Sequence, residues 1–263
     1  MKYQLSILLI CALLSSCVTL PETGQKKFLL TSVEDENKLG SDGYKEVLAK
    51  SKLANKSPNY AVLQRVGSRI ASATGIKDFQ WEYNLIESKE PNAWCMPGGK
   101  IAVYTGILPY MKNEAGMAAV LGHEVAHATL RHAGQRMSEQ MGTQIGLGLI
   151  GGTLFGNSPY KDQIMGAMGV GAGLAITLPF SRTHETEADT VGLRYMAEAG
   201  YDPREALEFW KRFSAETAGG APPEFLSTHP GGPTRIQNIK KNLSSALKIY
   251  KQAPQQSGTG VTL

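Results

Sequence analysis

Two histidines and a glutamate near the middle of the sequence are spaced for metal chemistry. They lie in the segment VLGHEVAHATLRH, where His123 and His127 are four residues apart and Glu124 follows the first histidine. On a helix this spacing places both imidazoles on one face, one turn apart. Burying a polar group without a partner is costly, so a common partner should satisfy both imidazoles.

A zinc ion is the partner that suits this spacing. Two imidazole nitrogens one helical turn apart can reach one ion at about 2.0–2.1 Å, and Glu124 can reach a water bound to it. Zinc lowers the pKa of such a water and a carboxylate can take its proton, as in the H-E-x-x-H signature of zinc peptidases. The alternative is a pair of core histidines that hydrogen-bond to the backbone. The apolar flanks AAVLG and ATL favour zinc, because they place the motif on a buried helix.

A third ligand is needed, because catalytic zinc usually takes three protein ligands and leaves the fourth position to water. The segment LPFSRTHETEAD contains Glu185 and Asp189, four residues apart on one face of an expected helix, whereas Glu187 points elsewhere. Glu185 can bind the metal while Asp189 hydrogen-bonds the far nitrogen of a ligand histidine and fixes its tautomer. A solvent-exposed acidic face is the alternative.

Three ordered motifs carry a family resemblance: LGHEVAHATLRH, LPFSRTHETEAD and STHPGGPTRI. Together they resemble the gluzincin metallopeptidase family of the CAAX prenyl endopeptidases and the HtpX-type proteases, over about residues 32–249. Within that family the likeness is greatest to the bacterial periplasmic lipoprotein members. The resemblance implies one zinc ion per chain as cofactor. His123, His127 and Glu185 would be its ligands, with Glu124 as the general base.

The resemblance also implies roles for residues outside the ligand set. The stretch PNAWCMPGGKIAVYTGIL matches the family's cleft-lining edge strand, so Asn92 and Ala93 are expected to contact an extended substrate that pairs with this edge. His229 is expected to donate to the tetrahedral oxyanion, a role that needs an N–H or a cation nearby. A loop histidine that braces the last helix is the alternative. Arg235 is expected to orient loops by pairing with a carboxylate.

Three further residues lie beside these motifs but hold no ligand position in the family pattern. His132 and His184 are expected to be structural or surface residues. Cys95 is interpreted as a small buried side chain. A Cys95 thiolate that switches the zinc off is the alternative.

Helices and one small sheet are expected to position the site. Periodicity predicts helices over about residues 58–74, 114–137, 183–199 and 234–250, and one that begins at Pro203. Strands are predicted over 79–86, 93–96 and 100–104, the last two as a hairpin. With the resemblance, this predicts an α+β fold: a mostly helical zincin-like metallopeptidase domain over 32–250, with a small sheet whose edge strand lines the active-site cleft.

Two other segments are expected to lie outside this framework. The tail 251–263 is small and polar, and is expected to be disordered. Residues 142–180 are glycine-rich and apolar, and are interpreted as packed helices or a flap near the cleft. A membrane-spanning segment is the alternative, since residues 163–180 carry no charge and are of borderline length.

The N-terminus resembles a bacterial lipoprotein signal. A positively charged start, a short apolar run and the residues LSSC predict a signal peptide over 1–16, a lipid on Cys17 and a tether over 17–31. An ordinary cleaved signal peptide is the alternative. Val18, rather than an aspartate, follows the cysteine and favours sorting to the outer membrane. The expected location is therefore the bacterial periplasm, with attachment to a membrane through the lipid.

Composition narrows the function further. The 263 residues carry a formal net charge of +4 with no basic run, so nucleic acid is not an expected partner. Of three cysteines only Cys95 remains in the mature body, so no internal disulfide is expected. The sequence predicts a zinc endopeptidase that degrades misfolded or unassembled envelope proteins. The alternatives are a latent protease that acts as a chaperone-like assembly factor, and an exopeptidase. No feature of the sequence indicates an oligomeric state.

Overall fold

The computed structural model describes residues 17–150, 180–217, 223–229 and 232–263. The predicted signal peptide and most of the glycine-rich segment 142–180 lie outside the described residues. In chain order the elements are β1 (Cys17–Thr19), β2 (Lys26–Phe28), α2 (Val33–Ala49), α3 (Pro58–Thr74), β3 (Glu82–Ile86), β4 (Ala93–Met96), β5 (Lys100–Tyr104), η1 (Thr105–Ile107), α4 (Leu108–Met111), α5 (Glu114–Thr129), α6 (His132–Ile150), α9 (Arg182–Glu198), α10 (Arg204–Glu216), α11 (Glu224–Thr228) and α12 (Gly232–Gln252).

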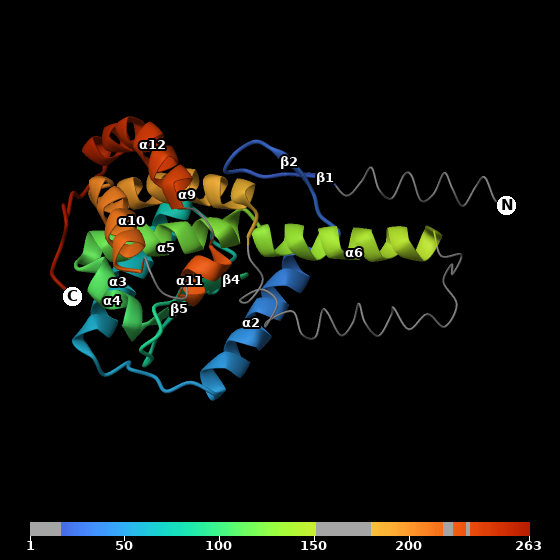
Figure 1. Ribbon diagram of the computed structural model, residues 1–263, viewed down its shortest axis with the longest axis horizontal. Helices are drawn as coiled ribbons and strands as arrows, with labels where there is room; N and C mark the ends of the chain where they lie inside the picture. Colours follow the sequence, from blue (N-terminus) through green and yellow to red (C-terminus); the bar gives the residue numbers. More distant parts are fainter. Residues whose placement is uncertain (1–16, 151–179, 218–222, 230–231) are drawn as a thin grey trace.

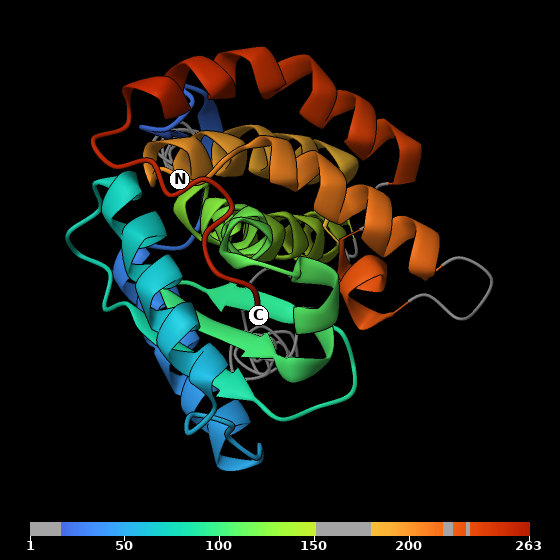
Figure 2. The ribbon, with the colours of Figure 1, turned by 90° about the vertical axis from the view of Figure 1, so that its left-hand side faces the viewer.

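Helix α5 lies at the centre of the molecule, between the sheet and α9 (Figures 1 and 2). The sheet has the strand order β3-β5-β4, in which β3 and β5 are parallel and β4 and β5 antiparallel. Helix α9 packs on α5, and α12 covers α9. Every residue of α5 is buried. The predicted α+β class is confirmed, and the H-E-x-x-H helix forms the core.

Two glycines set the distance between α5 and α9. A Cβ atom on Gly122 would lie 2.6 Å from the carbonyl oxygen of Gly192, and one on Gly192 would lie 2.7 Å from that of Gly122. The two helix backbones therefore meet directly, with no room for a side chain between them. Gly122 immediately precedes His123 in the sequence. The close contact thus brings the histidine-bearing face of α5 against α9.

The predicted helix over 114–137 is in fact two helices, α5 and α6. The break falls at Arg131, a non-glycine residue with a φ of 55°. Left-handed backbone is unfavourable for such a residue, and here the side chain holds it in place. The Arg131 guanidinium donates to Glu36 Oε1 at 2.7 Å and to the Thr31 carbonyl at 2.8 Å. Because of the break, His132 begins α6 instead of continuing α5.

The prediction of a disordered tail over 251–263 is wrong. The chain crosses the start of α5 (Figure 2), where the carbonyls of Val261 and Thr259 accept hydrogen bonds from the N–H groups of Glu114 and Ala115 at 3.0 Å each. The first N–H groups of a helix have no partner within the helix. The tail supplies these partners through its backbone, which its small, polar composition does not indicate.

The expected tether over 17–31 also makes specific contacts. Strands β1 and β2 form an antiparallel hairpin, and Leu20 and Leu29 next to it are buried. The Lys27 ammonium lies 2.7 Å from a carboxylate oxygen of Glu187 on α9. The segment therefore packs on the domain instead of leaving it as a free linker.

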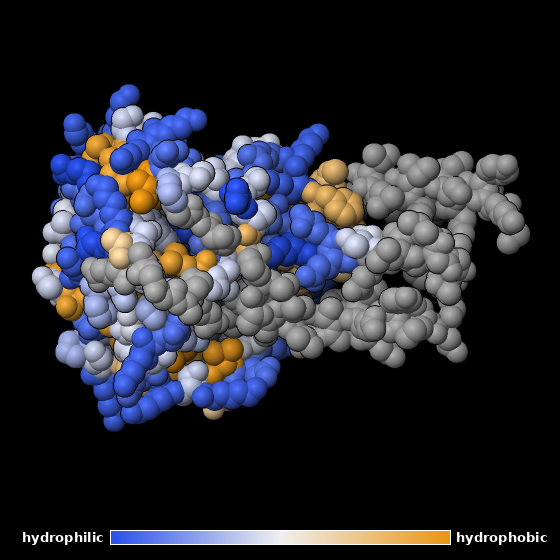
Figure 3. Space-filling view, in the orientation of Figure 1, coloured by the Kyte–Doolittle hydropathy of each residue, from blue (hydrophilic) through white to orange (hydrophobic). Residues whose placement is uncertain are grey.

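Apolar side chains are concentrated in the interior of the described structure. The face in Figure 3 is largely hydrophilic, with apolar patches separated by hydrophilic residues. Among the residues that the structure describes, none of the helices combines the length and the hydropathy needed to cross a membrane. Most of the apolar stretch 163–180, for which a membrane span is the alternative, lies outside those residues.

Substituting Gly192→Ala tests the contact between α5 and α9. The added methyl group would meet the Gly122 backbone, so we expect a loss of about 1–3 kcal/mol in the free energy of unfolding, measured by urea denaturation. Gly142→Ala on α6 is the matched control, because a Cβ there meets no described atom within 4 Å. Equal stabilities for the two variants would show that the glycine contact is not required.

Candidate metal centre

Helices α5 and α9 bring the three expected zinc ligands together. The Nε2 atoms of His123 and His127 lie 3.0 Å apart. Glu185 Oε2 lies 3.4 Å from His123 Nε2, and Glu185 Oε1 lies 3.3 Å from His127 Nε2. The three side chains are buried, with 2–3% of each residue exposed. Two imidazoles and a carboxylate thus face one another in the core.

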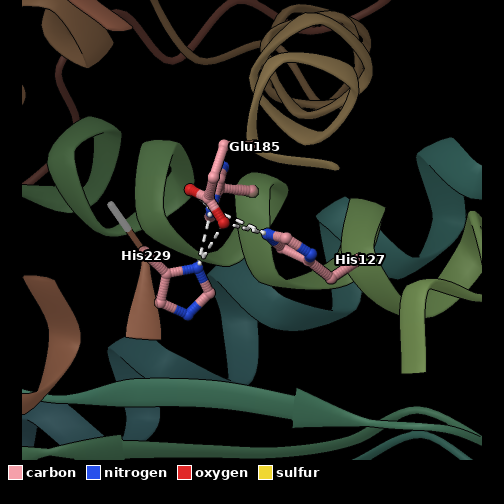
Figure 4. Close-up of side chains that lie close together, drawn as sticks. His127, Glu185 and His229 are labelled. Carbon is pink, nitrogen blue, oxygen red and sulfur yellow. Dashed lines mark hydrogen bonds and ion pairs between the residues drawn. The ribbon is translucent and has the colours of Figure 1, made fainter. Parts of the chain in front are cut away.

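His229 joins this group from the turn that follows α11. Its Nδ1 lies 3.3 Å from His123 Nε2 and 3.1 Å from Glu185 Oε1. Figure 4 shows His127, Glu185 and His229 converging from three separate parts of the chain. The candidate ligand atoms of the four residues all lie within 4.8 Å of one another. The structure therefore places His229 among the candidate metal-binding side chains, whereas the family resemblance implied a role at the substrate oxyanion.

The donor set, two of whose members have clearly shifted pKa values, fits a zinc ion. Burial lowers the pKa of His127 well below its ordinary value, which keeps the imidazole neutral. Burial raises the pKa of Glu185, but His229, Arg235 and His123 outweigh it, and the pKa falls well below its usual range. A histidine binds zinc as the neutral imidazole and a carboxyl group binds it as the carboxylate. His127 and Glu185 therefore have the required forms. Burial and Arg235 act to lower the pKa of His123, but Glu185 and Asp189 outweigh them and raise it, and a bound zinc ion would favour its neutral form instead.

Glu124 lies beside the group in a different electrostatic setting. Burial raises its pKa, in contrast to that of Glu185. Its Oε1 lies 3.5 Å from His229 Nε2 and has no hydrogen-bond partner among the described residues. When their surroundings shift the pKa values of two carboxyl groups in opposite directions, the two groups can have different chemical roles. Glu185 is suited to remain an anion, and Glu124 to take up and release a proton.

Asp189 and Arg235 contact the candidate ligands directly. Asp189 Oδ1 lies 3.0 Å from His123 Nδ1, the nitrogen that a ligand histidine must have hydrogen-bonded. Arg235 Nε donates to the same Asp189 oxygen at 2.9 Å, and its Nη1 lies 2.9 Å from Glu185 Oε2. The guanidinium carbon lies 3.5 Å from the centre of the Trp210 ring on α10. Arg235 thus pairs with carboxylates, the type of partner expected for it, and Trp210 is a support that the sequence did not indicate.

Two further polar side chains, His132 and Glu187, extend outward from the Nδ1 side of His127. His132 is fully buried, and its Nδ1 lies 2.9 Å from His127 Nδ1. Its Nε2 lies 3.2 Å from Glu187 Oε2. Burial raises the pKa of Glu187, but hydrogen bonds from His132 and Lys27 outweigh it and bring the pKa to about 2. Helical periodicity does not predict these contacts, because they depend on the break before α6, which turns His132 toward His127.

His184 stacks on His132 without joining these contacts. The two ring centres are 4.3 Å apart with the planes nearly parallel. Burial lowers the pKa of His184 to about 3, so the imidazole is neutral. Its Nδ1 is buried and has no hydrogen-bond partner among the described residues. The structure thus gives His184 a packing role.

The two residues expected to contact substrate lie on and beside the edge strand β4. Asn92 and Ala93 are 2% and 1% exposed, and the Asn92 side-chain oxygen accepts a hydrogen bond from the Ala93 N–H at 2.9 Å. Strand β4 pairs with β5 on one side only in the three-stranded sheet. Among the described residues, no further strand pairs with the other edge of β4, and both side chains are buried beside it. On the same strand, burial raises the pKa of the Cys95 thiol well above its usual value.

Paired substitutions on α9 test the third ligand. Glu185→Ala removes the carboxylate that faces both histidines, so we expect the protein to lose its zinc. Glu187→Ala leaves the four-residue group intact and should retain one zinc per chain at saturating zinc. Zinc bound per chain, measured by equilibrium dialysis at saturating zinc, distinguishes the two. The opposite pattern would overturn the choice of Glu185.

Comparison with known proteins finds similar metalloendopeptidases. The chain is 34% identical over 230 residues to the mitochondrial metalloendopeptidase OMA1 of Schizosaccharomyces pombe, covering 86% of this chain and 66% of that protein. It is 35% identical over 193 residues to OMA1 of Arabidopsis thaliana, covering 73% and 38%. It is 24% identical over 248 residues to the β-barrel assembly-enhancing protease of Escherichia coli, covering 93% and 51%. The chain spans less than two thirds of the length of each of these relatives.

These relatives overturn the expected location. The sequence predicted a lipid-anchored protein of the bacterial periplasm. The mitochondrial relatives from four organisms are 29–35% identical to the chain. The bacterial β-barrel assembly-enhancing proteases are only 24–25% identical. A signal judged from a short N-terminal segment does not outweigh a likeness that runs along the domain.

The family assignment rests on most of the folded domain. Residues 58–243 match Peptidase family M48. This stretch contains all four residues of the buried group, His123, His127, Glu185 and His229, and also Glu124. The chain therefore belongs to Peptidase family M48, a family of zinc metallopeptidases.

Proposed function

We propose that the chain is a zinc-dependent endopeptidase that cleaves misfolded or unassembled proteins. The observation that carries the proposal is the buried group of His123, His127 and Glu185 with Glu124 beside it. The named relatives are metalloendopeptidases or an assembly-enhancing protease, which supports the same reaction class. The 263 residues are too few to match the full length of these relatives, so the assignment concerns the catalytic domain.

Each side chain of the site would have a separate role in peptide hydrolysis. His123, His127 and Glu185 would hold the zinc ion. When bound, zinc polarises a carbonyl group and makes a water molecule more acidic. Glu124 would accept the proton of the attacking water on its carboxylate and later pass it to the leaving amine. Asp189 holds His123 in orientation through Nδ1, and Arg235 holds both Asp189 and Glu185.

The sheet edge suggests the kind of substrate. An extended chain can add to an exposed strand by backbone hydrogen bonds, which select unfolded conformation more than sequence. Strand β4 contacts the H-E-x-x-H helix α5 and is an edge strand of its sheet. A peptide that pairs with β4 would therefore run alongside the helix that bears Glu124. This supports unfolded or unassembled proteins as substrates, with Asn92 and Ala93 lining the strand.

A latent form of the same enzyme is the second candidate. Catalytic zinc sites keep one position open for water or substrate. His229 Nδ1 lies close enough to His123 Nε2 and Glu185 Oε1, at 3.3 and 3.1 Å, to fill such a position. A site closed in this way would bind proteins but cleave them slowly, as a chaperone-like assembly factor does. His229 would then be a switch, not the oxyanion donor that its motif implies.

Glu124→Gln tests the proposal, with cleavage of a reduced, alkylated protein as the assay. Without the general base we expect cleavage to fall by about 100-fold or more, while one zinc per chain is retained. Equal cleavage by Glu124→Gln and the unmodified protein would contradict the proposal. If neither cleaves although zinc is bound, the latent form is supported. In that case His229→Ala should raise cleavage, whereas an oxyanion donor would lower it.

We also propose that Cys17 carries a lipid, as its sequence context suggests. Cys17 is exposed at the start of β1, and the nearby Val18 and Phe28 are exposed hydrophobic residues. A single acyl chain binds membranes only weakly, and neighbouring apolar side chains add to it. Cys17→Ser should move the protein from the membrane fraction to the soluble fraction after cell lysis. Unchanged membrane association would exclude Cys17 as the attachment point.

A further inference from the structure

The two nitrogens of His127 face different surroundings. Its Nε2 points into the buried group, 3.0 Å from His123 Nε2 and 3.3 Å from Glu185 Oε1. Its Nδ1 points the other way, 2.9 Å from His132 Nδ1. A zinc ligand must present a lone pair to the metal, so Nε2 has to be free of a proton and Nδ1 has to carry it. Whatever accepts the Nδ1 proton therefore decides whether His127 can bind zinc.

A row of hydrogen bonds continues outward from His132. The His132 Nε2 lies 3.2 Å from Glu187 Oε2. The other oxygen of Glu187 accepts a hydrogen bond from the Lys27 ammonium on β2 at 2.7 Å. His132 is fully buried, and 11% of the Glu187 side chain and 16% of the Lys27 side chain are exposed. The row thus links the metal group to the N-terminal hairpin through groups that are largely shielded from water.

Only one arrangement of protons satisfies the row when His127 binds a metal. Glu187 is an acceptor, so His132 must donate to it from Nε2. A neutral imidazole carries one proton, so His132 Nδ1 is then an acceptor. It can receive the Nδ1 proton of His127, which leaves His127 Nε2 with its lone pair facing the metal group. The other His132 tautomer would force the His127 proton onto Nε2 and block that lone pair.

We infer that His132 is a positioning residue for zinc, which fixes the metal-binding tautomer of His127 with Glu187 behind it. This rests on the proposed function. The other histidine on α5 has a direct equivalent, since Asp189 Oδ1 lies 3.0 Å from His123 Nδ1. His127 has no carboxylate at that distance from its Nδ1 among the contacts of the described residues. Instead Glu187 fixes the proton of His132 on Nε2, which leaves His132 Nδ1 as the acceptor for the Nδ1 proton of His127.

The stacked histidine beside the row provides a matched control. The His184 ring is 4.3 Å from that of His132, but its Nδ1 makes no hydrogen bond with the residues described. His132→Phe removes both nitrogens and keeps the aromatic ring. His184→Phe makes the same change one ring further from the metal. His132→Asn is the conservative variant, because its side-chain oxygen can still accept a proton from His127.

The experiment measures the zinc dissociation constant of the full chain and the three variants, by competition with a chromophoric chelator. Loss of a group that orients a ligand histidine typically costs about 10–100-fold in metal affinity, and we expect this of His132→Phe. The zinc dissociation constant of His132→Asn should be closer to that of the unmodified protein, although asparagine fills the space of the imidazole less well than phenylalanine does. His184→Phe should change the constant little. If His132 only filled space, the order would be reversed, and His132→Phe would bind zinc more tightly than His132→Asn.

Two outcomes would overturn the inference: unchanged zinc affinity in His132→Phe, or an equal loss in His184→Phe. Nitrogen NMR of the unmodified, zinc-loaded protein gives a test that needs no variant. We expect the His127 proton on Nδ1 and the His132 proton on Nε2, and a His132 proton on Nδ1 would contradict the inference. If the unmodified chain binds no zinc, the proposed function itself fails, which separates the two claims.

Discussion

The direct contact between two helix backbones governs the rest of this structure. Gly122 and Gly192 let α5 and α9 approach so closely that a Cβ on either would come within 2.7 Å of the opposite backbone. His123 follows the first glycine at once, and Glu185 lies two helical turns before the second. Imidazole and carboxylate can therefore meet across the interface without long, flexible side chains. The sheet, α12 and the C-terminal tail all pack around this pair of helices.

Because α5 and α9 lie so close together, several ionisable side chains are buried between them. Ion pairs among these side chains offset the free energy that their burial costs. Burying a charge is unfavourable unless an opposite charge or a metal compensates it. Arg235 pairs with both Asp189 and Glu185, and Lys27 pairs with Glu187. Within the group of His123, His127, Glu185 and His229, several ligand atoms face one another. A zinc ion is the simplest partner for them, so the same interactions that form the site also tie metal binding to the stability of the core.

The parts of this site that depend on local periodicity could be predicted from the sequence. The four-residue spacings of His123 with His127 and of Glu185 with Asp189 translate directly into shared helix faces. The hairpin of β4 and β5 also has the predicted bounds, since Pro97-Gly98-Gly99 separates two apolar runs and both glycines have positive φ.

Features that depend on distant or unusual backbone could not be predicted in this way. Arginine is not a residue type that favours left-handed backbone. The break at Arg131 between α5 and α6, which turns His132 inward, therefore could not be predicted from the sequence. The partners of His229 lie 44 and 106 residues away in the chain. The tail binds α5 through backbone groups, which every sequence possesses. Composition therefore suggested disorder where tertiary hydrogen bonds impose order.

The most direct test of this account is a crystal structure of the zinc-loaded chain, with anomalous diffraction recorded at the zinc absorption edge. We expect one anomalous peak, bounded by His123, His127 and Glu185 at the contact of α5 with α9. The presence or absence of His229 at the same ion would then show whether the site is closed or open. A peak elsewhere, or no zinc in a correctly folded crystal, would contradict the claim that this buried group is a peptidase metal centre.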